Sequence, residues 1–192
     1  DGTEGFSRGI SRDKMGLKTS PFGELYLDDC FVPEENRLGP EGAGVSIFAT
    51  SMESERGYIL SSQLGAMQRQ LEEAIEFARG RRQFDQPIGR YQSVANRIVD
   101  MKLRVETCRL LLYKLAWLES RGESRAMDAA LSKLQLSESF IDSSLDAIRI
   151  HGARGYVQEL GIERDLRDSI GGIIYSGTSD IQRNVVARML GL

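Results

Sequence analysis

The strongest constraint on the fold is a run of apolar side chains that recur at alternating steps of four and three residues between positions 94 and 115. This spacing places all of them on one side of an α-helix, and such a side must be covered by other helices. The helix is expected to end near Arg121 and Gly122, where the pattern stops. The members of this stripe are Val94, Ile98, Met101, Val105, Cys108, Leu112 and Leu115.

Other segments have the same periodicity and complete a predicted bundle. One begins near Val45 and indicates an amphipathic helix of roughly 35 residues, and a third long helix follows Gly122. A short segment at 162–170 and a last helix at 180–190 come after it. The fold is therefore predicted to be mainly α, an up-and-down four-helix bundle. The stripe of the first helix contains Val45, Phe48, Met52, Ile59, Ser62, Ala66, Leu71 and Ile75, and that of the third contains Leu131, Leu134, Ile141, Leu145 and Ile148.

The N-terminal region, residues 1–38, has a different character. Glycine and proline punctuate it, and the run Glu24 to Val32 has the composition of a strand. One strand is too little to close a sheet by itself. We therefore expect residues 1–38 to be the last strands of a β-barrel domain, with the helical bundle at 39–192, and the chain to be a fragment of a longer protein.

Composition excludes several classes of function. The net charge of -3 provides no basic surface for nucleic acid. No stretch of about 18 apolar residues is present, so we expect no membrane span, and no targeting segment is visible. Cys30 and Cys108 are expected to be reduced thiols. The single histidine, His151, has no second histidine or nearby cysteine with which to bind a metal.

Glu55 is the most informative single residue because it interrupts the apolar stripe between Met52 and Ile59. A carboxylate in such a place is costly unless it is paired or functional. It could form an ion pair with Arg56 or another arginine, or it could act as a general base. Glu138 interrupts the third stripe in the same way, and an ion pair is the stronger interpretation there.

Two other motifs have alternative interpretations. The arginines at 79, 81 and 82 suit either a solvated helix end or a phosphate-binding clamp. The Ser-Gly-Thr-Ser turn at 176–179 directly precedes the last helix. Such a turn can cap that helix, or its free backbone N–H groups can bind an anion.

Several motifs, in this order along the chain, resemble the acyl-CoA dehydrogenase family. The resemblance covers the whole chain and implies the end of the middle β-domain followed by the C-terminal helical domain. The matching stretches are Gly5-Phe6-Ser7, Lys14-Met15-Gly16, Glu24 to Asn36, Arg81-Arg82-Gln83-Phe84, Pro87-Ile88-Gly89 with Gln92, and Tyr175 to Arg183.

The resemblance implies that FAD is the cofactor. In the family, residues at the matching positions bind the flavin nucleotide, commonly that of a neighbouring subunit, and this supports a homotetramer. The implied cofactor-binding residues are Arg81, Phe84, Gln92, Arg149, Ile150, His151, Gly152, Ala153, Thr178, Ser179 and Asp180. Gly152 to Gly155 depart from the usual Gly-Gly-x-Gly, and Asp180 replaces a common glutamine.

The chain also departs from the family where many members carry the catalytic glutamate. It has Ser176 there, and a serine cannot act alone as the base for a carbon acid. A minority of members, which include isovaleryl-type and prolyl-carrier-protein-type dehydrogenases, carry the base on the first long helix. The matching position is Glu55, which the stripe had already singled out. The resemblance also implies that Arg56, Ser176 and Gly177 lie beside the substrate.

The implied reaction is α,β-dehydrogenation of an acyl thioester, in which Glu55 removes a proton and the flavin accepts a hydride. The substrate would be carried by coenzyme A or by a carrier protein, for example as a prolyl group. Electrons would pass to an electron-transfer flavoprotein or to oxygen. A non-catalytic helical bundle remains a second interpretation. The expected location is the bacterial cytoplasm or the mitochondrial matrix.

Overall fold

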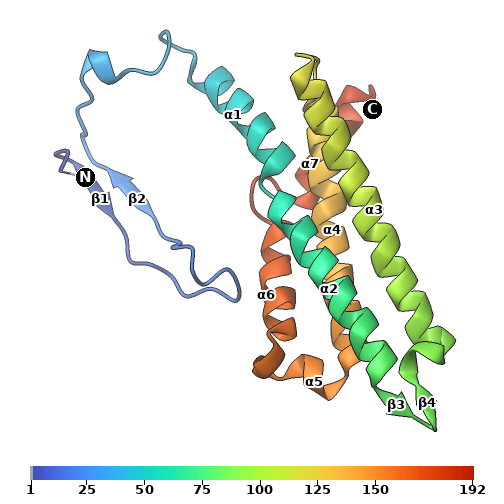
Figure 1. Ribbon diagram of the computed structural model, residues 1–192. Coiled ribbons are helices and arrows are strands. Elements are labelled where there is room, and N and C mark those ends of the chain that lie inside the picture. Colours follow the sequence, from blue (N-terminus) through green and yellow to red (C-terminus); the bar gives the residue numbers. More distant parts are fainter. Residues whose placement is uncertain (1) are drawn as a thin grey trace.

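The computed structural model describes residues 2–192 and consists mainly of helices around one central helix (Figure 1). The long helices are α1 (Gly44–Tyr58), α2 (Ser61–Gly80), α3 (Gln92–Ser120) and α4 (Ala126–His151). Shorter helices follow: α5 (Ala153–Tyr156), α6 (Ile162–Gly172) and α7 (Ser179–Met189). This architecture confirms the predicted mainly α fold.

The stripe predicted on α3 is confirmed as its buried side. The five residues from Met101 to Leu115 are buried, and Val94 and Ile98 are half-buried against the same core. The helix ends at Ser120, and Gly122 then adopts a left-handed conformation with φ of 67°. Its apolar spacing therefore determined both the position and the orientation of this helix.

Helix α4 lies at the centre of the bundle, where it contacts α1, α2, α3, α6 and α7. The predicted stripe of leucines and isoleucines is wrong as the most buried side, because all five of its members are only half-buried. Small side chains make up most of the buried residues of α4, since they let several helices approach closely. They are Ala129, Ala130, Ser132, Ser137, Ser139, Ser143, Ser144 and Ala147.

The predicted single helix between Val45 and Ile75 is wrong, because the chain bends between α1 and α2. Ile59 and Leu60 form a turn there, and Leu60 leaves the helical region with φ of -95° and ψ of 4°. Glycine and paired serines are common at such bends, and Gly57, Ser61 and Ser62 flank this one. The bend directs Leu60 into the core, whereas Ile59 remains exposed.

The bend also changes which residues of the first stripe are buried. Val45 and Phe48 are exposed, and on α2 the buried side lies one residue beyond Ile59, Ser62 and Ala66, at Leu60, Gln63 and Met67. Ile59 and Ser62 instead share a side with Glu55, and that side faces a cavity described below.

The N-terminal segment contains one small antiparallel sheet. Strand β1 (Phe6–Arg8) pairs with β2 (Leu25–Leu27), and Ser7 lies opposite Tyr26. The strand predicted from Glu24 to Val32 is thus reduced to three residues, because Asp29 takes a left-handed φ of 49° that interrupts an extended strand. The remaining short elements are η1 (Glu34–Asn36), β3 (Arg82–Gln83), β4 (Gln86–Pro87), η2 (Ile88–Arg90) and η3 (Gln158–Leu160).

Two kinds of feature are missing from residues 2–192. None of their helices combines the length and apolar composition that crossing a bilayer requires. Nor do three or more histidine, cysteine, aspartate or glutamate side chains gather as metal ligands would.

Candidate active site

Glu55 lies on the wall of a cavity of about 730 Å³ between α1, α6 and the N-terminal segment. The side chain is half-buried and comes from the penultimate turn of α1, just before the bend. Most of the surrounding wall is apolar, so a ligand bound there would be shielded from water. The apolar lining includes Met15, Leu17, Pro21, Phe22, Ile59, Ile170, Ile174 and Tyr175.

The N-terminal segment closes one side of this cavity through specific hydrogen bonds to α6. The backbone N–H of Leu17 donates to Asp168 Oδ1 at 2.6 Å, and Arg167 Nη1 donates to the carbonyl of Met15 at 2.9 Å. A Cβ on Gly16 would lie 2.4 Å from the carbonyl oxygen of Arg167, so only glycine permits this close approach. The Lys14-Met15-Gly16 motif therefore has a local structural role.

Ser176 connects the last turn of the chain to Glu55. Its hydroxyl donates a hydrogen bond to Glu55 Oε1, although the two residues are 121 positions apart. The turn has an unusual backbone, with a positive φ at both Ser176 (54°) and Gly177 (88°). Gln182 from α7 holds it in place, because its Nε2 donates to the carbonyls of Gly177 at 3.0 Å and Ser176 at 3.3 Å.

The hydroxyl of Thr178 caps α7 by accepting from the N–H of Ile181 at 3.2 Å, as the capping interpretation predicted. The neighbouring Ser179 hydroxyl is buried and has no hydrogen-bond partner among residues 2–192. Asp180 is exposed and pairs with Arg183. Ser179 is thus the one member of this predicted flavin-binding group with an unused buried polar atom.

Two cations lie behind the turn. The side chain of Lys133 is 1% exposed and donates to the carbonyl of Gly172 at 2.7 Å, at the C-terminus of α6. Burial lowers the pKa of its ammonium to about 8, an effect that Glu138 opposes and Arg56 reinforces. The Nε of Arg56 is also buried, and no described residue accepts a hydrogen bond from it.

The ion pairs that the sequence left open have different outcomes. Within residues 2–192, no ion pair joins Glu55 to Arg56; the carboxylate bonds to Ser176 instead. Glu138 does form the expected pair, with Arg183 Nη2 at 3.5 Å. Of these two carboxylates, Glu55 is the one that faces a cavity and has no ion-pair partner among residues 2–192.

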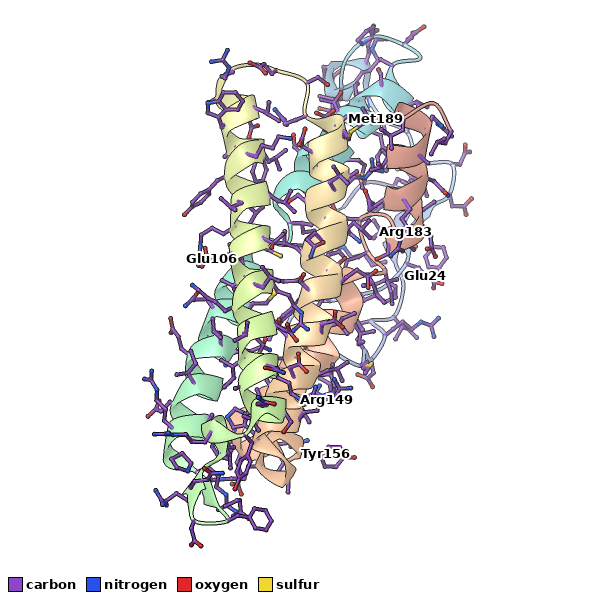
Figure 2. All side chains as sticks on the ribbon, turned by 90° about the vertical axis from the view of Figure 1, so that its right-hand side faces the viewer. Glu24, Glu106, Arg149, Tyr156, Arg183 and Met189 are labelled. Carbon is purple, nitrogen blue, oxygen red and sulfur yellow. The ribbon has the colours of Figure 1, made fainter. Side chains whose placement is uncertain are left out.

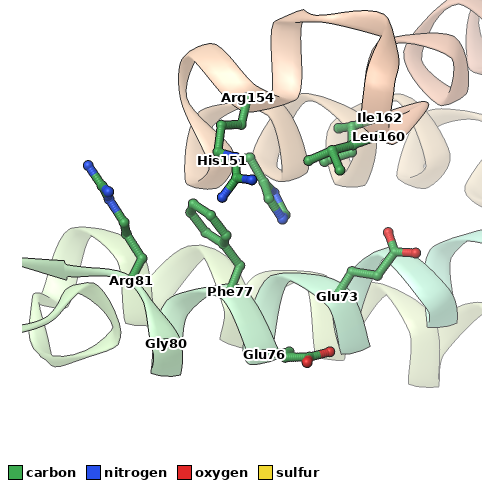
Figure 3. A pocket seen from close by; sticks show the side chains of 9 residues that line it. All are labelled: Glu73, Glu76, Phe77, Gly80, Arg81, His151, Arg154, Leu160 and Ile162. Carbon is green, nitrogen blue, oxygen red and sulfur yellow. The ribbon is translucent and has the colours of Figure 1, made fainter.

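A second hollow lies at the opposite end of the bundle, between α2 and α5, and consists of two adjoining cavities of about 650 and 530 Å³. Phe77, Arg81, His151 and Arg154 line both of them. Figure 3 shows the Phe77 ring facing the His151 ring, and their centroids are 4.4 Å apart. His151 Nδ1 bonds to the carbonyl of Ala147 at 2.8 Å, which orients the imidazole.

The hollow contains charges of both signs, because Glu73 and Glu76 line it together with Arg81 and Arg154. The guanidinium groups of Arg81 and Arg154 form no hydrogen bond or ion pair with any described residue, although they line one cavity. Unpaired arginines beside an aromatic ring are well suited to a phosphate and an attached planar group. Among the predicted residues, Ile150, Gly152 and Ala153 also line this hollow.

Six predicted flavin-binding residues do not line it: Thr178, Ser179 and Asp180 at the start of α7, and three others that lie nearer to it. Phe84 is 88% exposed and packs edge-on against Tyr91 at the tip of the β3–β4 hairpin. Gln92 is exposed at the start of α3, and Arg149 turns toward Asp146. The sequence analysis did not single out Arg154 or Phe77, which both line the hollow. Arg154 was noted only as part of a stretch that departs from a glycine motif. No sequence pattern distinguishes Phe77 from a core residue.

The predicted flavin-binding residues thus form two separate groups. Figure 2 shows Arg149 near the lower end of α4, whereas Arg183 of α7 lies well above it. Thr178, Ser179 and Asp180 lie at the N-terminus of α7. Arg81 and the predicted residues that line the hollow with it lie at the lower end of the bundle. About half of α4 separates them, because Glu138 in the middle of that helix pairs with Arg183 of α7, whereas His151 ends it.

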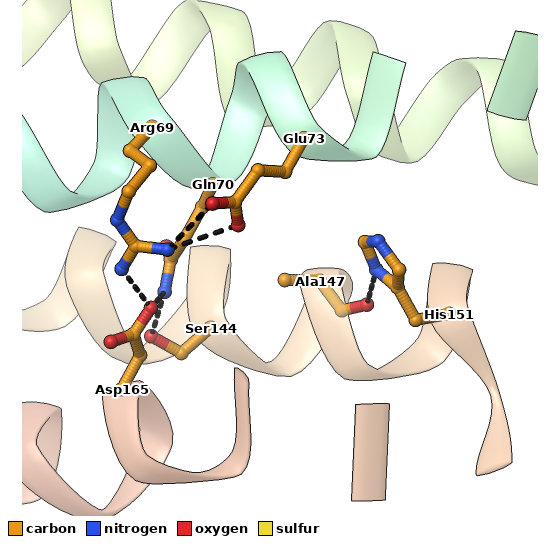
Figure 4. Close-up of polar contacts among 7 residues, drawn as sticks. All are labelled: Arg69, Gln70, Glu73, Ser144, Ala147, His151 and Asp165. Atoms are coloured by element: carbon orange, nitrogen blue, oxygen red, sulfur yellow. Dashed lines mark hydrogen bonds and ion pairs between the residues drawn. The ribbon is translucent and has the colours of Figure 1, made fainter. Parts of the chain in front are cut away.

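A polar network holds α2, α4 and α6 together between the two regions (Figure 4). Asp165 accepts from Arg69 Nη2 at 2.5 Å and from Gln70 Nε2 at 3.2 Å. Gln70 also donates to Ser144 Oγ at 2.9 Å, and Arg69 pairs with Glu73 at 3.0 Å. These contacts fix α6, which supplies part of the Glu55 cavity, relative to the central helix.

Comparison with known proteins gives concordant matches. Residues 42–191 match the family described as acyl-CoA dehydrogenase, C-terminal domain. The chain is 52% identical, over 94% of its length, to L-prolyl-[peptidyl-carrier protein] dehydrogenase of Pseudomonas fluorescens, of which it covers 47%. It therefore spans about half the length of this relative.

Two solved structures extend the likeness to the fold. The prolyl acyl carrier protein oxidase AnaB has a TM-score of 0.98 and 46% identity, over the whole of this chain and 51% of that one. A structure described as PigA with FAD and proline also has a TM-score of 0.98, with 44% identity over the whole of this chain and 50% of that one.

Proposed function

Because this chain belongs to the acyl-CoA dehydrogenase family, we propose that it is part of an FAD-dependent enzyme that dehydrogenates an acyl thioester. The single observation that supports this best is the Glu55 carboxylate. It faces an apolar cavity and has no cationic partner among residues 2–192. A carboxylate in this setting suits the removal of a proton from carbon.

Glu55 would accept the proton α to the thioester carbonyl. The carbon–carbon double bond then forms as the hydrogen on the β-carbon leaves with its electron pair. FAD, when bound, supplies the acceptor for that hydride. The apolar wall and the N-terminal segment keep water from the reacting atoms. Ser176 lines the same cavity, whereas Arg56 and Gly177 lie next to each other behind it.

We infer that Arg81 and Arg154 hold the diphosphate of FAD, and that the neighbouring aromatic rings support the rest of the nucleotide. At the Thr178–Asp180 turn, the unpaired Ser179 hydroxyl would donate a hydrogen bond to the cofactor. Loss of FAD affinity in Arg81→Met and Arg154→Met, measured by flavin release on dilution, tests this assignment. Arg121→Met is the control, because that arginine lies on Trp117 at the far end of α3.

The substrate we favour is a prolyl thioester on a carrier protein, because the relative at 52% identity bears that name. A free acyl-CoA is the second candidate, which the family description supports. The two differ in what carries the acyl group. The rates of flavin reduction by prolyl-carrier protein, by the same group on coenzyme A, and by butyryl-CoA therefore distinguish them.

The electron acceptor is proposed to be either an electron-transfer flavoprotein or oxygen. The name of AnaB, an oxidase, supports the second possibility. Hydrogen peroxide formed in stoichiometric amounts during turnover in air would identify an oxidase. Turnover only with an added electron-transfer flavoprotein would identify a dehydrogenase.

We also propose that the protein forms a homotetramer that uses the outer side of α3. This side exposes a line of large apolar residues, each more than half exposed, and monomers rarely leave such a line uncovered. The line consists of Val99, Leu103, Leu110, Tyr113 and Trp117.

The decisive experiment follows flavin bleaching in the full-length protein after addition of the prolyl-carrier thioester. We expect Glu55→Gln to bind flavin normally and to bleach at least a hundredfold more slowly, as for the loss of a general base. Glu53→Gln is the matched control, because Glu53 lies on the same helix but pairs with Arg125.

Bleaching of Glu55→Gln at the wild-type rate would disprove the assignment of the base. A full-length protein that binds no flavin would instead support the non-catalytic bundle. Bleaching by none of the three thioesters, with flavin bound, would refute the proposed substrate class.

A further inference from the structure

We propose that Ser176 is a positioning residue, whose hydroxyl bonds to the Glu55 carboxylate and directs it into the cavity. This inference rests on the proposed function, since it concerns the base of that reaction. It gives Ser176 a different role from the substrate contact that the family resemblance implied. The hydroxyl acts on the base, not on the thioester.

The first support is the direction of the hydrogen bond. An ionised carboxylate can only accept, so the Ser176 hydroxyl must donate to Glu55 Oε1. A donor of this kind favours the charged form of the acid, which is the form that can remove a proton. Among the described residues, Ser176 is the one hydrogen-bond donor to this carboxylate.

The second support is the backbone that presents the hydroxyl. Ser176 has a φ of 54°, in a region that residues other than glycine seldom adopt. Glycine would relax this turn, yet the chain has a serine there. A side chain kept in an unfavourable backbone region is a reason to look for a function of that side chain.

The third support is the buried amide that holds the turn. Gln182 is fully buried, and its Nε2 donates to the carbonyls of both Ser176 and Gly177. A Cβ on Gly177 would come within 2.6 Å of that nitrogen, so the turn and the amide fit closely. This arrangement fixes the direction in which the hydroxyl points.

Other charged groups surround the carboxylate but are engaged elsewhere. From the N-terminal segment, Lys14 bonds to the carbonyls of Leu17 and Ser20, and Arg167 of α6 bonds to Glu163. The phenol of Tyr175, whose pKa burial raises, accepts from Gln63. On the α1 and α4 side, Arg56 and Lys133 lie behind the turn.

Removal of the donor should therefore move the protonation of Glu55 to higher pH. A hydrogen bond to a charged group typically corresponds to a change of about one pH unit or slightly more. The acidic limb of the profile of kcat/KM against pH should rise by about that amount. The rate at high pH, where the carboxylate is ionised without help, should change much less.

The test compares wild type with Ser176→Ala and Ser176→Gly in the flavin-loaded, full-length protein. Glycine is the informative variant, because it lacks the hydroxyl but is well suited to the positive φ, so it should fold at least as well. Two quantities are measured. One is the pH profile of flavin reduction, and the other is the titration of the Glu55 carboxyl by isotope-edited infrared spectroscopy, with Glu55→Gln to identify the band.

We expect both variants to move the infrared midpoint and the acidic limb upward together. Gln182→Met, which loosens the turn but keeps the hydroxyl, should move them in the same direction by less. Unchanged midpoints in Ser176→Ala and Ser176→Gly would overturn the proposal even if the wild type is active. Absence of wild-type activity would count against the proposed function instead, since the infrared titration needs no turnover.

Discussion

The buried ammonium of Lys133 should make the stability of this protein depend on pH in an unusual direction. An ordinary lysine has a pKa of 10.5, whereas burial, more than any other influence, lowers that of Lys133 to about 8. This difference corresponds to about 3 kcal/mol at 1.36 kcal/mol per pH unit. That is the free energy by which the folded state disfavours the charged form relative to the unfolded chain.

The sign follows from proton binding. Between pH 8 and pH 10.5 the unfolded chain holds the proton on this lysine and the folded protein has released it. The unfolded state then binds more protons, so the free energy of unfolding rises as the pH increases. Below pH 8 both states are charged and the full cost is present; above pH 10.5 it has disappeared.

Lys133→Met isolates this contribution, because methionine has a similar length and no charge. We expect the variant's advantage in free energy of unfolding over wild type to be greatest below pH 8. It should shrink by about 3 kcal/mol as the pH approaches 10.5. Urea unfolding of the full-length protein, followed by circular dichroism at several pH values, measures this. Groups that titrate in both proteins, such as the tyrosines, cancel in the difference.

The variant also loses the hydrogen bond to the Gly172 carbonyl, which changes the difference in free energy of unfolding by the same amount at every pH. The test of the reasoning is therefore how this difference varies with pH. Parallel stability curves for wild type and variant would show that the ammonium is neither desolvated nor titrating near pH 8.

Three further outcomes are expected. Asp165→Ala should lower the free energy of unfolding by about 2 kcal/mol, because it removes the acceptor that joins Arg69 and Gln70 of α2 to α6; a change within error in urea unfolding would contradict this. Leu103→Arg should reduce the proposed homotetramer to smaller species in light scattering and shift the emission of Trp117, the one tryptophan of these 192 residues, to the red; an unchanged mass would place the interface elsewhere. At pH 8 a thiol reagent should modify Cys30 and spare Cys108, because burial raises the pKa of the Cys108 thiol; equal labelling on mass spectrometry would refute it.

Sequence periodicity predicted the fold where one side of a helix is apolar and the other polar. The helix α3 is such a case, and the positions from Met101 to Leu115 are buried as expected. The periodicity failed on α4, because a central helix has neighbours on almost every side. Serine and alanine are most of its own buried residues, since they let those neighbours approach closely. A pattern of large apolar residues cannot reveal that, since the small residues have little hydrophobicity of their own.

The candidate site was predicted unevenly for a similar reason. Glu55 was identified because a carboxylate on an apolar stripe conflicts with its surroundings, and it faces a cavity. The bend after Tyr58 was missed, so the stripe was interpreted as bundle core when its side with Ile59 and Ser62 forms the cavity wall. The bond from Ser176 joins segments 121 residues apart, and no local pattern could indicate it.

That bond has a consequence for how such a protein can change over time. The side chains of Glu55 and Ser176 meet, so a carboxyl group attached to either segment would reach nearly the same small volume. An acid can therefore migrate from one point of attachment to the other through an ancestor that carries both, without the reaction ever lacking it. Two positions far apart in the sequence could therefore each supply the carboxyl group to the same site.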